Sequence, residues 1–299
     1  MGRPMGIIKK IGYAAFETAD LLRLSEYYQE ILGLDVEAET QDAVFLRCPS
    51  DRHSVVLRKG DGSDCTRLGL EVASDDDLLK LQQLLTSRGI AVSRATDPAP
   101  SVARRISFRG PGRFTIEVQV EAPVSLWDAS KGAIRPLRLG HVAFKVANVT
   151  AATAFFTELL EFRESDWIGD FFAFLRCGPD HHTVNFLNNS NERMHHIAFQ
   201  LEDILHIQHA CDFLGKRRLP LIWGPGRHGP GHNIFTYHHN PDGQIVELYA
   251  ELDQMSDEAL GYFDPQPWHE EFPQHPKVWE PGLSASNVWG IPGPPSFRD

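Results

Sequence analysis

The sequence is poor in cysteine: four stand among 299 residues, and none belongs to a CxxC pair. This scarcity excludes a small disulfide-stapled fold and argues against a paired-thiolate metal site, so we expect reduced thiols in a cytoplasmic protein. Long apolar runs are also missing, and none approaches the ~18 residues that cross a bilayer. The N-terminal MGRPMGIIKK lacks a signal-peptide core, and Gly6 breaks the myristoylation pattern.

Blocks of positive charge are absent as well. Lys and Arg number 29 against 40 for Asp and Glu, which gives a net charge of −11. This balance excludes nucleic acid or an anionic membrane as the main partner. The 42% hydrophobic content excludes a mainly disordered chain, and the length predicts two domains.

Histidine is almost missing from the first half of the chain. Only His53 precedes residue 140, whereas eleven of the fourteen histidines lie between His141 and His239. The two halves are therefore expected to have different roles.

The two halves nevertheless repeat one another in order, at offsets that drift only from 128 to 130 residues. Such a repeat indicates a duplicated architecture. The matching segments are IGYAAF (Ile11–Phe16) with LGHVAF (Leu139–Phe144), YYQEILGL (Tyr27–Leu34) with FFTELLEF (Phe155–Phe162), the stretches beginning at Val44 and Ala173, LGLEV (Leu68–Val72) with IAFQL (Ile197–Leu201), and GPGRFTIEV (Gly110–Val118) with NPDGQIVEL (Asn240–Leu248).

Each copy shows a strand, a helical segment with apolar residues at 3–4 spacing, and short strands separated by turns, and then repeats this plan. We therefore predict an α+β fold of two duplicated domains, each made of two βαβββ modules. The domains are expected at residues 1–125 and 136–255, with the boundary near Ala122–Pro136. The predicted helices are Leu21–Leu32, Asp75–Arg88, Thr150–Leu160 and Ile204–Leu214.

The last segment, residues 263–299, has a different composition. It contains eight of the twenty prolines and three of the six tryptophans: Trp268, Trp279 and Trp289. Because disordered tails are poor in aromatic residues, we predict an ordered arm that docks on the body or on a neighbouring subunit. A proline-rich ligand for another domain is the alternative.

The repeat serves as an internal control for function. His141 aligns with Tyr13, His196 with Arg67, and Glu247 with Glu117. The second half thus offers two imidazoles and a carboxylate, the ligand set of 2-His-1-carboxylate iron sites, where the first half offers Tyr, Arg and Glu. We predict the metal in the second half.

Strand alternation supports this assignment. His141, His196 and Glu247 each lie opposite the apolar row of their strand, so three strands can direct them into one concavity. The alternative is three unrelated strand residues.

The segment GRHGPGHNIFTYHHNPDGQIVE, from Gly226 to Glu247, closely resembles the C-terminal signature of the type I extradiol ring-cleavage dioxygenases, members of the vicinal oxygen chelate superfamily. Thr236 departs from the signature, where an apolar residue is usual. The resemblance extends over both halves to about Glu251 and leaves out the arm.

The resemblance implies the glyoxalase/bleomycin-resistance/dioxygenase fold, with open barrel-like sheets and a metal-free N-terminal domain. It implies that His141, His196 and Glu247 hold Fe(II), with Mn(II) as an option. It further implies that His182 lies beside bound O2, and that His228 and Tyr237 hydrogen-bond the substrate's oxygens. The expected reaction is extradiol (meta) cleavage of a catechol with insertion of both atoms of O2, in a homo-oligomer of four or more subunits.

Several further side chains stay open. Alternation alone does not separate His181 from His182, and the family pattern favours His182. His195 is expected to face away from His196. At least one of three histidines is expected to support the site while the others are solvated, and three aromatic residues are candidates for either the pocket or the core. These are His232, His238 and His239, and Trp167, Phe171 and Phe172; His206, His209, His269 and His275 are expected to be peripheral.

Two other functions compete with ring cleavage. A glyoxalase-like metal isomerase or lyase on the same scaffold would not need His182, His228 and Tyr237. A non-catalytic, ligand-sequestering protein would need a pocket but no complete ligand triad.

Overall fold

A computed structural model describes residues 6–100, 102–120, 133–264 and 274–297. Most of the predicted domain boundary, together with Trp268 and His269, lies outside these residues.

The first half contains two βαβββ modules, as the repeat predicts. A π-helical turn, Tyr27–Ile31, extends the first helix. The elements are β1 (Ile8–Thr18), α1 (Leu21–Glu26), β2 (Asp35–Glu39), β3 (Ala43–Arg47) and β4 (Val55–Lys59), followed by β5 (Cys65–Val72), α2 (Asp75–Ser87), β6 (Ser93–Ala99), β7 (Val102–Arg109) and β8 (Thr115–Val120).

The second half repeats this order. Its elements are β9 (Arg138–Val146), α3 (Val149–Leu159), β10 (Arg163–Ile168), β11 (Phe172–Arg176) and β12 (Val184–Asn188), followed by β13 (Arg193–Gln200), α4 (Ile204–Lys216), β14 (Leu221–Arg227), β15 (Ile234–His239) and β16 (Ile245–Ala250).

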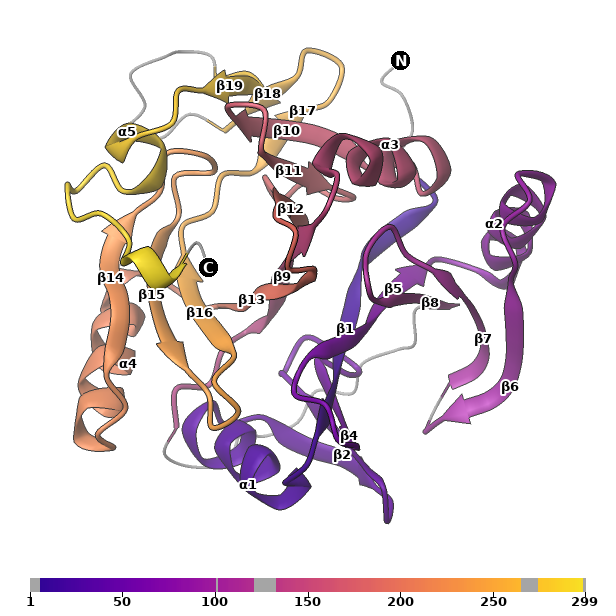
Figure 1. Ribbon diagram of the computed structural model, residues 1–299, viewed down its shortest axis with the longest axis horizontal. Helices are drawn as coiled ribbons and strands as arrows, with labels where there is room; N and C mark the ends of the chain where they lie inside the picture. The colour runs from indigo at the N-terminus through magenta and orange to yellow at the C-terminus, as the bar shows by residue number, and fades with distance from the viewer. Residues whose placement is uncertain (1–5, 101, 121–132, 265–273, 298–299) are drawn as a thin grey trace.

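Each half forms one curved mixed sheet. The strand order is β2-β3-β4-β1-β5-β8-β7-β6 in the first half and β14-β15-β16-β13-β9-β12-β11-β10 in the second. Figure 1 shows the two curved sheets, with α4 alongside β14 and β15 and α3 alongside β10 and β11. The predicted α+β, duplicated fold is confirmed. Among the helices of the described segments, none has the length and apolarity to cross a membrane.

The helices begin at polar side chains that cap their free backbone N–H groups. Ser74 accepts from the N–H of Asp77 at α2, Asn148 caps α3, and Asp203 accepts from the N–H of His206 at α4. These caps explain why each long helix starts within one residue of its predicted position.

The main apolar core extends across both halves. Val142, Phe144 and Ile197 lie on the strand faces opposite the predicted metal ligands, and they are buried in this core, as strand alternation predicts. Phe114 of the first half stacks on Phe144 with ring centroids 4.0 Å apart. The apolar sides of both sheets therefore pack together, which leaves the opposite sides free for polar side chains.

The C-terminal arm docks on the second half. Its strand β19 (Lys277–Trp279) pairs in parallel with β10 and becomes the ninth strand of that sheet. Two short strands, β17 (Met255–Asp257) and β18 (Tyr262–Phe263), precede it, and α5 (Leu283–Ser286) and the 3-10 turn Pro295–Phe297 follow. In Figure 1 this yellow segment runs beside β14 and ends in front of β15. Trp279 donates its indole N–H to Asp166, whereas Trp289 is half exposed beside Arg227.

A buried carboxylate joins the two halves. Asp51, in the loop after β3, accepts hydrogen bonds from the Leu139 N–H at 2.8 Å and from the Ser54 hydroxyl at 2.7 Å. Burial raises the pKa of Asp51 to about 6, although both hydrogen bonds oppose the shift.

Replacing this carboxylate should change how stability depends on pH. Asp51 binds a proton more tightly folded than unfolded, so lowering the pH from 7.5 to 4.5 favours the folded state through this group by about 2 kcal/mol. Asp51→Asn lacks this gain. Urea unfolding at both pH values should show the difference between wild type and variant, and the exposed control Asp76→Asn should not.

Candidate active site

Ala198, at the centre of β13, positions the proposed ligands. It is paired with His141 on β9 and with Glu247 on β16, and His196 lies two residues away on the same strand. Side chains paired across neighbouring strands share one face of the sheet, and a methyl group leaves the larger ones room to converge. All three residues are at least 96% buried.

The three ligand atoms form a tight triangle. His141 Nε2 lies 3.1 Å from His196 Nε2 and 3.0 Å from Glu247 Oε2, and His196 Nε2 lies 3.2 Å from the same oxygen. Ligands at right angles around an ion with bonds of about 2.1 Å stand about 3 Å apart. The donor set therefore fits a divalent metal, and it is the one group of this kind within the described part of the chain.

The carboxylate of this triangle is ionised. Burial alone would raise the pKa of Glu247, but the neighbouring His141 and His196 outweigh it and hold the pKa well below its usual range. Burial lowers the pKa of His196 against the opposing pull of Glu247. The ionised carboxylate is a buried negative charge that a bound cation can balance.

Asn233 orients the carboxylate and was not singled out by the sequence. Its side-chain N–H donates to Glu247 Oε1 at 3.0 Å, which leaves Oε2 for the triangle. Asn233 is fully buried. Its place within the Gly226–Glu247 signature was the available signal, but an asparagine between turn residues looks like part of the turn.

His182 lies directly against the triangle. Its ring centroid is 4.4 Å from that of His141, and its Nδ1 is 3.0 Å from the Nδ1 of His181. Burial lowers the pKa of His182 well below its usual value. His181 points instead toward Asp166, with 3.1 Å between its Nε2 and the carboxylate.

His228 and Tyr237 form a hydrogen-bonded pair on the other side. His228 Nε2 is 2.9 Å from the Tyr237 hydroxyl and 3.9 Å from Glu247 Oε1. Burial lowers the pKa of His228 to about 4 and raises that of Tyr237 well above its usual value. The pair therefore combines a neutral imidazole with a protonated phenol.

The prediction that His195 faces away from His196 was wrong. The two Nδ1 atoms lie 2.6 Å apart, and both side chains are buried. The pairing of β13 with β9 shifts register between Met194 and His196. An extra residue at such a β-bulge interrupts the alternation of faces, so neighbouring side chains can lie together.

The aromatic residues beside the site differ from the candidates. Phe174 contacts His182, and Trp223 stacks on Tyr237 with the rings inclined by 11°. Phe297 of the arm meets Tyr237 edge to face at 4.7 Å. The candidates lie elsewhere: Phe172 packs on Phe174, Phe171 is exposed, and Trp167 bonds Glu164.

Two of the three histidines that the sequence left open between supporting the site and being solvated are buried. His238 bonds the Tyr27 hydroxyl of the first half at 2.6 Å, and His232 lies 2.8 Å from Asp253. His239 is exposed. Both buried histidines contact other segments of the chain, and a local sequence pattern does not reveal such contacts.

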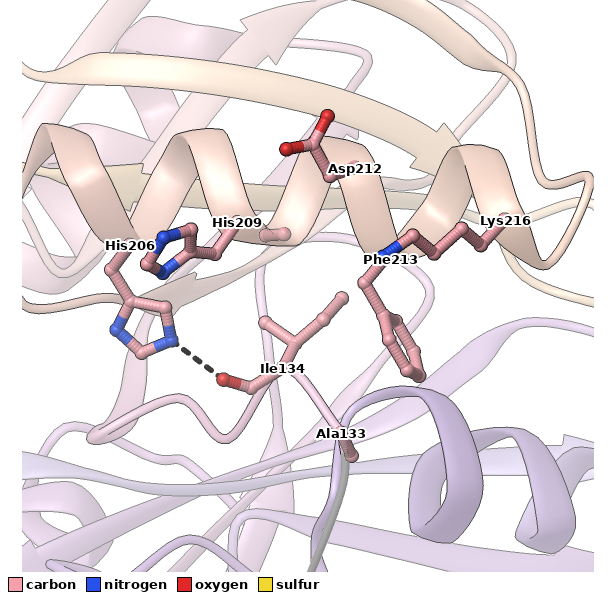
Figure 2. Close-up of a pocket in the computed structure, with 8 residues that line it drawn as sticks. Ala133, Ile134, His206, His209, Asp212, Phe213 and Lys216 are labelled. Carbon is pink, nitrogen blue, oxygen red and sulfur yellow. Dashed lines mark hydrogen bonds between the residues drawn. The ribbon is translucent and has the colours of Figure 1, made fainter.

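A separate cavity of about 390 Å³ lies between α4 and residues 133–134. Figure 2 shows His206 and His209 lining it, with His206 Nε2 bonded to the Ile134 carbonyl at 2.6 Å. His275 contacts Tyr262 in the arm region. These three histidines are peripheral to the triangle, as expected.

The equivalent place in the first half is filled. Gly69 stands where Ala198 does, and the Tyr13 ring covers it so closely that a Cβ would overlap the ring. Glu117 accepts from the Tyr13 hydroxyl and from Arg67 at 2.8 Å, and Arg105 lies 3.1 Å from it. Its charge is thus balanced without a metal.

A family model, the glyoxalase/bleomycin resistance protein/dioxygenase superfamily, matches residues 10–118 and 138–248. The two matched stretches correspond to the two halves and together cover most of the chain.

Similar proteins include the metapyrocatechase of Pseudomonas sp. (strain CF600), 25% identical over 81% of this chain and 86% of the relative. The 3-methylcatechol 2,3-dioxygenase of Pseudomonas putida (strain F1) is 28% identical over 80% and 89%. The crystal structure of a Mn(II)-bound glyoxalase from Novosphingobium aromaticivorans matches with a TM-score of 0.85 and 25% identity, over 99% of this chain and 95% of that one.

The two halves allow a matched test of the metal triangle. His196→Ala removes one of three ligands, so Mn(II) affinity of the metal-free protein should fall by more than roughly 100-fold, beyond the usual cost of losing a residue that only supports a ligand. Arg67→Ala, at the equivalent position, should leave it unchanged. Calorimetric titration measures both, and loss of binding in the Arg67 variant would put the metal in the first half.

Proposed function

The chain belongs to the glyoxalase/bleomycin resistance protein/dioxygenase superfamily, and from this premise we propose that it is an extradiol dioxygenase. The proposed reaction cleaves a catecholic ring beside its two hydroxyl groups and inserts both atoms of O2. The proposed substrate class follows that of the similar proteins, metapyrocatechase and 3-methylcatechol 2,3-dioxygenase.

One observation carries the proposal: the buried triangle of His141, His196 and Glu247 lies within reach of the His228–Tyr237 pair. A metal ligand set alone would suit many reactions. The neighbouring acceptor and donor match a substrate that loses protons and whose oxygens need hydrogen bonds.

The proposed metal ligands are His141 Nε2, His196 Nε2 and Glu247 Oε2. A divalent iron or manganese ion held there would supply open positions for the catechol oxygens and O2 and lower the pKa of the catechol hydroxyls. Asn233, which donates to Oε1 of Glu247, would leave Oε2 free to hold that ion.

His228 and Tyr237 are proposed to act on the substrate oxygens. A neutral imidazole accepts a proton at Nε2 as a hydroxyl ionises, and the phenol, which burial keeps protonated, donates a hydrogen bond to the oxygen that carries charge. His182, against His141 on the opposite side, is the proposed proton donor and acceptor for the O2-derived oxygens.

The domain division at residues 1–125, 136–255 and 263–299 belongs to the same proposal. The Glu117 carboxylate is already paired with Tyr13, Arg67 and Arg105, and this supports an N-terminal domain without metal. Fe(II) is the proposed metal, with Mn(II) as the other candidate, and a cytoplasmic homo-oligomer stays a prediction.

One observation favours a second candidate function. The likeness to a protein described as a Mn(II)-bound glyoxalase supports a metal isomerase or lyase on the same scaffold. Such an enzyme transforms its substrate without consuming O2, and a ligand-sequestering protein binds without turnover.

Oxygen uptake separates the three functions. Protein reconstituted anaerobically with Fe(II), or with Mn(II), should consume one O2 per catechol and form a yellow ring-opened product. A panel of monocyclic and bicyclic catechols in an oxygen-electrode assay tests this. Turnover without uptake would favour the isomerase, and the absence of uptake with every catechol would refute the proposal.

Tyr237→Phe tests the role of the phenol. Losing one donor to a charged oxygen should lower kcat by roughly 100-fold, with the metal content unchanged. Tyr28→Phe, which changes a buried tyrosine of the core between the halves, is the control and should keep kcat. Steady-state kinetics with metal analysis decide the matter, and an unaltered kcat in the Tyr237 variant would remove it from the reaction.

A further inference from the structure

Two backbone carbonyls of the C-terminal arm accept hydrogen bonds from histidines of the site. The Ser286 oxygen lies 2.7 Å from His228 Nδ1, and the Phe297 oxygen lies 2.8 Å from His195 Nε2. A carbonyl oxygen only accepts, so each of these two ring nitrogens must carry a hydrogen.

The first contact fixes the state of His228. Burial favours the neutral imidazole, which has a hydrogen on one nitrogen and a lone pair on the other. With its hydrogen on Nδ1, His228 turns the lone pair of Nε2 toward the Tyr237 hydroxyl, 2.9 Å away.

The second contact reaches a proposed metal ligand. With its hydrogen on Nε2, His195 has a lone pair on Nδ1, 2.6 Å from the Nδ1 of His196. His196 must then donate from Nδ1, and its own lone pair lies on Nε2, the atom that faces His141 and Glu247. The β-bulge in β13 makes this relay possible, since it brings the two rings together.

The arm is held in place by several contacts around these carbonyls. The fully buried Asn287 side chain accepts from the Arg227 N–H and donates to the Ile291 carbonyl. Trp223 donates its indole N–H to the same carbonyl, and the Phe297 ring meets both Trp223 and Tyr237 edge to face.

We propose that the C-terminal arm supports the proposed metal centre by orienting its histidines. Through the Ser286 and Phe297 carbonyls it fixes the hydrogen positions of His228 and, by way of the positioning residue His195, of the ligand His196. The inference rests on the proposed function only in taking the His141–His196–Glu247 triangle as the metal site.

Histidine tautomers are observable in the metal-free, full-length protein. With ¹⁵N-labelled histidine, two-bond ¹H–¹⁵N spectra should show hydrogen on Nε2 of His195 and on Nδ1 of His196 and His228. In His195→Phe the fixed Nδ1–H state of His196 should be lost while His228 stays unchanged. In Asn287→Ala, which acts from the arm, the fixed state of His228 should be lost. His206→Phe, which removes a histidine bonded to a carbonyl away from the site, is the control and should change neither.

Metal affinity gives the second readout. His195→Phe should weaken Mn(II) binding roughly 10–100-fold, the range expected when the support of a ligand is lost, and His206→Phe should not. Variants that keep both the wild-type tautomers and the wild-type affinity would overturn the role of the arm while leaving the proposed function intact. Wild-type protein that binds neither Fe(II) nor Mn(II) would overturn the proposed function instead, whatever the tautomers.

Discussion

The ionised carboxylate of Glu247, a buried side chain on β16, is the constraint on which the site depends. A charge taken out of water is costly unless donors or a cation meet it. Asn233 donates to one oxygen, and His141 Nε2 lies 3.0 Å from the other. The first half has the same problem at Glu117 and solves it with two guanidinium groups and a phenol. The two halves thus balance one buried charge in different ways, and the divalent ion that we propose for the second half would leave positions open for chemistry.

The duplicated fold makes this difference between the halves possible because it places the same three strand positions together twice. In each half the central strand carries a residue without bulk, Gly69 or Ala198, between the two flanking positions. Side chains from both neighbours then meet above it. The opposite faces of the sheets pack into one core, with Phe114 on Phe144, so the site is built on strands that cannot shift without disturbing that packing.

The sequence contained much of this arrangement. The repeat predicts all four βαβββ modules, and alternation along three strands predicts the shared face of His141, His196 and Glu247. Alternation gave the wrong face for His195, because one extra residue in the strand interrupts the alternation of faces. A β-bulge has no characteristic residue composition by which the sequence could reveal it. Trp223 and Phe297 were missed for a different reason: their contact joins residues 74 positions apart through a segment whose docking depends on its backbone. Local patterns predict elements and faces, whereas contacts between distant segments require the assembled chain.

The composition of the arm explains how a peripheral segment can serve the site. Ser286 ends the single turn of α5 and Phe297 ends a 3-10 turn, so neither carbonyl has an acceptor role within its own helix. Pro292, Pro294 and Pro295 lie between them and carry no N–H that could compete for these oxygens. Carbonyls left free in this way must find other donors once they are covered, and the imidazoles of His228 and His195 are the donors at hand. The same two contacts therefore satisfy the hydrogen-bonding needs of the arm and give the tautomers required at the proposed metal site.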